Sequence, residues 1–122
     1  MSKDQNSTRY LFVFRFAEDA PDPTPEQMQQ MHQQWTDWMQ GMRKKGQFVS
    51  GDPLEETTGK VLRGTRGSQV TDGPFAEAKE IMGGIIVVTA PSLEAAVELA
   101  RDCPSLGGPF SVEVRQINPL NL

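Results

Sequence analysis

The side chains best suited to acid–base chemistry in this chain are one histidine and a few carboxylates. His32 is the only histidine among the 122 residues, so any histidine-based proton transfer must use it. Asp72 precedes a Gly-Pro pair and has two interpretations. Its carboxylate either accepts hydrogen bonds from backbone amides and fixes a turn, or faces a pocket as a base or ligand anchor. We predict His32 and Asp72 as the catalytic candidates; a plain surface histidine is the alternative for His32.

Three further residues are candidates for binding a small molecule. Arg15 interrupts an apolar strand, so it either lies at an exposed strand end or points inward as an anchor for an anionic ligand. Trp35 belongs to the apolar stripe of the helix that carries His32. Glu77 lies three residues before Glu80, so a helical turn would place both carboxylates on one side, where they can hold a cation. A solvated charged turn is the alternative there.

The remaining reactive side chains predict less. Arg43, Lys44 and Lys45 lie near a predicted helix carboxyl end, where cations interact favourably with the macrodipole; a small anion site is the alternative. Cys103 is the only cysteine, which excludes an intramolecular disulfide, and we expect it to be a packed thiol. No Cys/His cluster has zinc-type spacing and no glycine-rich phosphate loop is present, so we expect neither a metal nor another cofactor.

Composition excludes two broad classes of protein. The net charge of −4 argues against a nucleic-acid-binding protein, which usually carries a basic surface. No apolar run approaches the length of a membrane span, and Met1–Thr8 lacks the features of a secretory signal. We therefore expect a soluble cytoplasmic protein. The length fits one domain over residues 1–122, with Met1–Thr8 frayed.

The first half of the chain predicts a strand and a long amphipathic helix. Arg9–Phe16 is predicted to be a strand. The alternate positions on both of its faces are largely apolar, which is typical of a strand covered on each side. Thr24, Pro25 and Gln27 form a capping box that begins a helix, and Gly46 ends it. Apolar side chains then recur at spacings of three and four and form one stripe that packs on a sheet: Met28, Met31, Trp35, Trp38 and Met42.

The second half predicts a hairpin, further strands and another helix. The β-branched run Ile85–Val88 is typical of a strand buried on both faces. Ser92 caps the second helix, which Pro104 ends. The remaining elements are the strands Gln47–Leu54, Ile81–Thr89 and Ser111–Ile117, and a surface hairpin of Lys60–Arg63 and Ser68–Thr71 around Gly64–Gly67.

The order of these elements predicts the fold class. Without the hairpin, the order is strand, helix, strand, strand, helix, strand, which is the ferredoxin-like βαββαβ pattern of an α+β protein. Such a sheet carries both helices on one face, yet both faces of Arg9–Phe16 and of Ile85–Val88 are apolar. A second copy of the chain is the simplest cover. We therefore predict a homodimer packed sheet to sheet as a dimeric α+β barrel.

A set of short motifs extends in a fixed order over nearly the whole chain. Its members are Gly-Asp-Pro-Leu at 51–54, Gly-Lys-Val-Leu-Arg at 59–63, Asp-Gly-Pro-Phe at 72–75, Leu-Glu-Ala-Ala at 93–96 and Val-Glu-Val-Arg at 112–115. In this order they resemble the DGPF branch of the YCII-related family. The resemblance implies a ferredoxin-like fold and a dimeric α+β barrel, in agreement with the pattern of elements.

The resemblance also implies two alternative functions. Some YCII-like members are proposed to use a His–Asp pair in a pocket, with the histidine on the first helix and an aspartate later on it; this chain has His32 and Asp37 there, and Ser105 where many relatives have a histidine. We therefore expect a homodimer that binds a small molecule, in one form as an enzyme with a His/Asp acid–base pair. The alternative is a regulatory or interaction module associated with an extracytoplasmic-function sigma factor, which predicts an exposed apolar patch.

Overall fold

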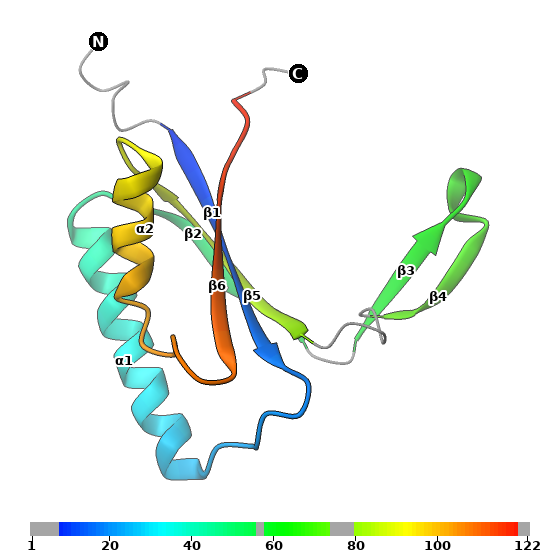
Figure 1. Ribbon diagram of the computed structural model, residues 1–122, viewed down its shortest axis with the longest axis horizontal. Helices are drawn as coiled ribbons and strands as arrows, with labels where there is room; N and C mark the ends of the chain where they lie inside the picture. The colour runs from blue at the N-terminus through cyan, green and yellow to red at the C-terminus, as the bar shows by residue number, and fades with distance from the viewer. Residues whose placement is uncertain (1–7, 56–57, 74–79, 120–122) are drawn as a thin grey trace.

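A four-stranded antiparallel sheet forms the centre of the molecule (Figure 1). The computed structural model describes residues 8–55, 58–73 and 80–119. The strand order across the sheet is β2-β5-β1-β6, and each neighbouring pair is antiparallel. The strands are β1 (Arg9–Ala17), β2 (Phe48–Pro53), β5 (Glu80–Thr89) and β6 (Phe110–Gln116). This order is the one that a ferredoxin-like βαββαβ chain produces, so the predicted α+β fold class is confirmed.

Both described helices lie on one face of this sheet (Figure 1). Helix α1 is Pro25–Lys44 and helix α2 is Leu93–Arg101. The predicted capping box is present, because the Thr24 hydroxyl accepts from the Gln27 backbone N–H and the Gln27 side chain accepts from the Thr24 N–H. Gly46 has φ +71°, a left-handed conformation that ends α1 at little steric cost.

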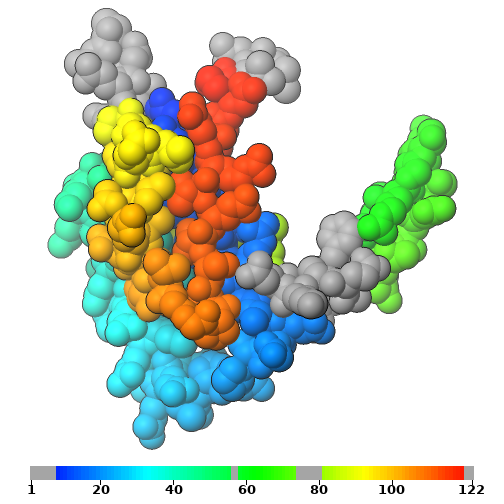
Figure 2. All heavy atoms as spheres, in the orientation of Figure 1, coloured from blue at the N-terminus to red at the C-terminus, as the bar shows by residue number. Residues whose placement is uncertain are grey.

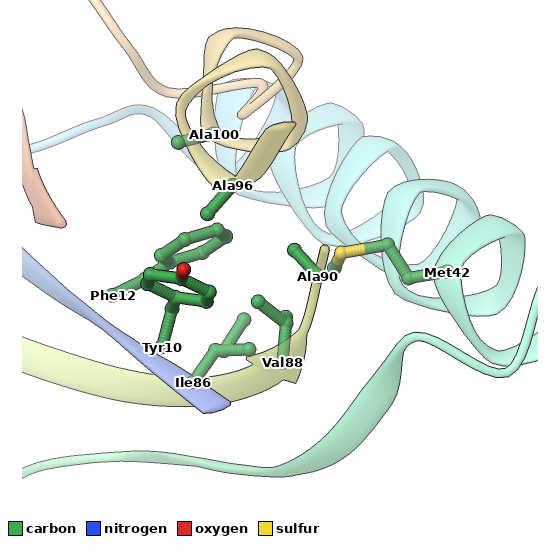
Figure 3. Close-up of a cluster of buried hydrophobic side chains, with 8 residues drawn as sticks. All are labelled: Tyr10, Phe12, Met42, Ile86, Val88, Ala90, Ala96 and Ala100. Atoms are coloured by element: carbon green, nitrogen blue, oxygen red, sulfur yellow. The ribbon is translucent and has the colours of Figure 1, made fainter. Parts of the chain in front are cut away.

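The core lies between the two helices and the sheet (Figure 3). Phe12 of β1 and Val88 of β5 are fully buried. The buried side chains of helix α2 are the small ones of Ala96 and Ala100, and the partly buried Leu99 packs against the same cluster. Helix α1 contributes Met42 to the same cluster. Burying a phenylalanine or valine side chain stabilises the fold by roughly 1.5–3 kcal/mol. The cluster therefore holds both helices firmly against the sheet.

The opposite face of the sheet carries no described helix (Figure 1). Side chains alternate along a strand, so the residues between those of the core point to this second face. They are apolar at its centre: Leu11, Val13, Ile85 and Val87. Val13 is already buried by its neighbours within the chain, whereas the other three are half-buried. This apolar face, named here the open face, is the one expected to be covered by a second copy.

A separate two-stranded hairpin extends from the body of the protein. It consists of β3 (Gly59–Arg63), a short 3-10 turn at Thr65–Gly67 and β4 (Gln69–Gly73). Figure 2 shows the hairpin, in green, standing clear of the helices and of β6. Leu62 and Val70 face each other across the two strands and are 61% and 55% exposed. The hairpin was predicted from Lys60–Arg63 and Ser68–Thr71, and its second strand extends two residues further.

Candidate functional site

A cleft of about 640 Å³ lies between helix α1 and the sheet. Its walls come from the apolar side of α1, from the sheet strands and from the loop that follows α2. Three of the predicted site residues line it: Arg15, His32 and Trp35. Most of the other lining side chains are apolar, and they include Phe14, Met28, Met31, Met39, Phe48, Ile86, Leu106, Phe110 and Val112. Concave and mostly apolar sites of this volume are typical of small-molecule binding.

Helix α1 lines the cleft with the first half of its apolar stripe. Met28 is 58% exposed and Met31 is half-buried, whereas Met42 near the other end of the helix is only 3% exposed. The stripe therefore divides into two parts. Its carboxyl-terminal part completes the core, and its amino-terminal part remains accessible at the cleft. Methionine side chains suit the accessible part because they adapt to ligands of different shape.

Trp35 stands at the boundary between the cleft and the core. Its ring meets the edge of Phe14 at a centroid distance of 4.9 Å and that of Trp38 at 5.3 Å. Its Nε1–H donates to the Ser105 hydroxyl at 2.6 Å, which ties α1 to the loop after α2. Two ring contacts and one hydrogen bond fix the orientation of this side chain. Trp35 is thus a rigid wall of the cleft.

Two glycines of β5 leave the space that the cleft occupies. Gly83 and Gly84 lie on the sheet side of the cleft, where larger residues would project into it or into its walls. A Cβ on Gly83 would come within 3.1 Å of the Phe16 ring, and a Cβ on Gly84 within 3.1 Å of the Asp52 carbonyl oxygen. Both contacts are tighter than ordinary van der Waals packing. Small residues at this point therefore keep the sheet side open.

Two polar side chains of α1 lie at opposite ends of the helical wall. His32, near the amino end, is exposed, and Arg43, in the last turn, lies with its guanidinium 4.5 Å from the centroid of the Phe48 ring. None of the ion pairs between described residues involves Arg43. In the sequence, Arg43 is recognisable only as one of three cations near a helix carboxyl end. Its place beside the cleft follows from the packing of α1 against β2, which local sequence does not reveal.

Arg15 lines the cleft, but its guanidinium is engaged elsewhere. Its Nη1 donates to the Glu113 carboxylate at 2.5 Å, and the side chain is 29% exposed. Glu113 pairs with Val13 in the sheet register, so this ion pair lies over the open face. The β1–β5 register shifts between Phe14 and Arg15, which leaves Gly83 without a partner in β1. Arg15 is therefore neither a free strand end nor an unpaired anchor within the chain.

Asp72 does not lie with His32. It belongs to β4 of the hairpin, and its carboxylate accepts from Lys60 Nζ at 2.6 Å. Its side chain is 92% exposed, and Asp72 is not one of the residues that line the cleft. Asp72 lies in a strand opposite Lys60, and no hydrogen bond between described residues joins its carboxylate to a backbone amide. Glu80 is the first residue of β5; Glu77 lies outside the described residues, so the pairing of the two carboxylates stays a prediction.

The other residues singled out from the family pattern lie apart from each other. Asp37 is exposed and accepts from Gln33 Nε2 at 2.9 Å on the outer side of α1. Ser105 lines the cleft, and its hydroxyl accepts the hydrogen bond from Trp35 Nε1–H. Cys103 is buried and also lines the cleft. Loss of hydration raises the pKa of the Cys103 thiol, against the smaller opposing effect of hydrogen bonds from the backbone of Ser105 and Leu106. Cys103 is therefore a packed thiol, as predicted, and not an activated nucleophile.

Metal binding has no geometric support in the described part of the chain. No group of three or more histidine, cysteine, aspartate or glutamate side chains converges there. Neither described helix is both long and apolar enough to span a membrane. The chemistry available at the cleft is thus that of an apolar binding site with one histidine and one unpaired arginine on its helical wall.

Comparison with known families agrees with this geometry. The model of the YCII-related domain matches residues 8–121. The chain belongs to the YCII-related family. The match does not separate the DGPF branch from the rest of the YCII-related proteins, so that assignment stays a prediction based on residues 72–75. No curated protein matches the chain.

Proposed function

We propose that this YCII-related protein is a homodimer that binds a small apolar molecule in the cleft between α1 and the sheet. The observation that carries the proposal is the cleft itself, which is about 640 Å³ in volume. Its wall is fixed by Trp35, whose ring contacts Phe14 and whose Nε1–H bonds Ser105. A preformed apolar site with a rigid aromatic wall binds a ligand at little entropic cost, because few side chains must be ordered.

The homodimeric part of the proposal is supported by the open face of the sheet. Three of its four central side chains, Leu11, Ile85 and Val87, are only half-buried within one chain. A sheet with apolar residues on both faces is normally covered on both. A second copy that presents the same face satisfies the two-fold symmetry of most homodimers. Sedimentation equilibrium that gives the mass of one chain would remove this part and leave the cleft unaffected.

The enzymatic form of the proposal assigns proton transfer to His32. This side chain lines the cleft and is the only histidine. Asp72 is its expected partner in the acid–base pair, but within one chain Asp72 bonds Lys60 on the hairpin. The enzymatic form therefore depends on His32 more than on the pair. A His32→Gln variant that retains full turnover of any substrate found for the protein would eliminate it without affecting binding.

Binding of N-phenyl-1-naphthylamine, a neutral apolar fluorophore, tests the proposal. We expect its emission to rise on binding the wild-type protein. Met31→Trp puts a larger side chain into the cleft and should weaken this binding roughly tenfold, which corresponds to about 1.4 kcal/mol. The matched control is Gln34→Trp, which adds the same indole to an exposed position of α1. It should change the affinity by less than about twofold, as expected for a surface substitution.

Two results of this experiment contradict the proposal. In the first, the wild-type protein gives no increase in emission at any accessible probe concentration. In the second, Met31→Trp and Gln34→Trp bind the probe equally, which would place the bound probe outside the cleft. Circular dichroism of both variants distinguishes either result from a loss of fold.

A second candidate function is favoured by the hairpin. Leu62 and Val70 form an exposed apolar pair on it and do not line the cleft, and an interaction module requires such exposed apolar side chains. The partner proposed for such a module is an extracytoplasmic-function sigma factor. Co-purification from the native host should then recover a sigma factor with the wild-type protein and lose it with Leu62→Ser. Recovery of no transcription protein counts against this candidate.

A further inference from the structure

We infer that the ligand of the cleft is an amphiphilic organic anion, with an apolar body along α1 and an acidic group at Arg43. This inference rests on the proposed function, because it names the class of molecule that the same cleft takes. The apolar body follows from the methionine and aromatic lining described above. The acidic group follows from the distribution of charge along the cleft.

The helical wall of the cleft is elongated and changes character along its length. It runs from Met28 to Arg43, which are 15 residues apart in the sequence and therefore about 22 Å apart along the helix axis. Met28, Met31 and Met39 make most of this wall apolar. The wall ends at a guanidinium. A molecule that fills the cleft along α1 thus meets an apolar surface first and a cation at the end.

Arg43 is the cation at the cleft with no carboxylate partner in the described part of the chain. Arg15, the other arginine at the cleft, is neutralised by Glu113 over the open face. Arg43 is instead held over the ring of Phe48, which orients the guanidinium without neutralising it. A guanidinium held in this way keeps its hydrogen-bond donors available for a carboxylate or sulfonate.

The acidic residue among the described residues that line the cleft, Asp52, does not compete for Arg43. Asp52 pairs with Ile85 in the β2–β5 register, next to the pair of Gly51 with Ile86. Ile86 belongs to the core on the helix side, so alternation directs the side chains of Asp52 and Ile85 toward the open face. Asp52 is among the residues that line the cleft, but the alternation along β2 directs its carboxylate toward the open face, and no ion pair between described residues joins it to Arg43.

The end of α1 carries a net positive charge. A helix carboxyl end has a partial charge of about half a negative charge, which alone would repel an anion. Arg43, Lys44 and Lys45 offset it with three positive charges, and none of them has a carboxylate partner among the ion pairs of the described residues. The helix end is thus attractive to an anion, although the protein as a whole has a net charge of −4.

Two fluorophores that differ by one acidic group test this inference. 8-Anilinonaphthalene-1-sulfonate has the ring system of N-phenyl-1-naphthylamine plus a sulfonate. We expect the sulfonate to bind the wild-type protein more tightly than the neutral compound, and Arg43→Gln to weaken only the sulfonate, by roughly three- to fivefold, as for a solvent-accessible ion pair. Arg43→Lys should restore part of that loss. Added salt should reduce the difference between the two probes.

The control variants locate the effect. Lys44→Gln removes a neighbouring charge that does not line the cleft and should leave the ratio of the two affinities within about 1.5-fold of the wild type, as expected for a solvated charge that makes no contact with the probe. Met31→Trp should weaken both probes, which shows that both occupy the cleft rather than the open face.

The possible outcomes separate this inference from the proposed function. If the neutral probe binds in the cleft and the sulfonate binds no tighter, or if its binding is insensitive to Arg43→Gln, the anionic class is wrong and the proposed function stands. An equal loss with Lys44→Gln and Arg43→Gln overturns the assignment of the acidic group to Arg43. If neither probe binds, both the inference and the proposed function fail.

Discussion

The cleft and the hairpin both leave apolar side chains accessible, but they do so in opposite ways. At the cleft, Met28 and Met31 lie on a helix whose other end is anchored by Met42 in the core. In the hairpin, Leu62 and Val70 lie on two strands that pair only with each other. The cleft is a cavity in the packed part of the molecule, whereas the hairpin is an arm outside it (Figure 2). The two regions therefore carry different proposals: a small ligand for the cleft and a macromolecular partner for the hairpin.

The two predicted catalytic residues lie in different regions of the molecule. His32 and Trp35 line the cleft, while Asp72 lies on the hairpin beside Lys60. The motif that contains Asp72 is therefore valuable for recognising the family and weak as evidence for catalysis. The residues that shape the cleft, including Gly83 and Gly84, are ordinary in type and were not singled out by their chemistry.

The largest expected effect contrasts the stability of the two regions. Phe12→Ala empties a fully buried site beneath α2 and should lower the free energy of unfolding by about 3–5 kcal/mol. Leu62→Ala truncates a side chain that is 61% exposed on the hairpin and should lower it by less than about 1 kcal/mol. Urea unfolding followed by tryptophan emission measures both. An equal loss of unfolding free energy in the two variants would mean that Leu62 is covered in solution and that the hairpin is not an exposed arm.

A smaller effect concerns thiol reactivity in the two regions. Burial raises the pKa of Cys103, so less of the thiol is present as the reactive thiolate, and it should react with iodoacetamide more slowly than an exposed thiol at the same pH. The comparison is Ser68→Cys in a Cys103→Ser background, since Ser68 is exposed on the hairpin. Equal rates for the two thiols would show that Cys103 is not desolvated.

The same raised pKa predicts a pH dependence of stability. The folded protein holds the Cys103 proton more tightly than the unfolded chain does, so its contribution is fully present below the unfolded pKa. That contribution is lost as the pH rises through the higher folded value. The loss of stability at alkaline pH should therefore be smaller in Cys103→Ser than in the wild-type protein. If stability declines in parallel in the wild-type protein and in Cys103→Ser, the raised pKa of Cys103 is contradicted.

The fold could be predicted because its signals are local. Thr24, Pro25 and Gln27 form a capping box within four residues, and the run Ile85–Val88 indicates a buried strand by composition alone. The order of such elements then selects one common topology. The position of Gly46 at the end of α1 is likewise set by its own backbone conformation.

The candidate site could be predicted only in part, because it depends on contacts between distant segments. The stripe on α1 predicted that Trp35 packs on the sheet, but not that Met28 and Met31 remain at an open cleft. For Asp72 the sequence leaves a turn role and a pocket role open, and neither reveals its partner Lys60, which is twelve residues away across a strand pair. The place of Arg43 over Phe48 likewise depends on how α1 packs against β2, and no pattern within either element specifies it.

A crystal structure of the protein with N-phenyl-1-naphthylamine shows whether the cleft between α1 and the sheet is the ligand site. We expect electron density for the ring system between α1 and β5, in contact with Phe14 and Trp35. Density for the probe only on the open face or on the hairpin, with the cleft filled by the protein's own side chains, would contradict it.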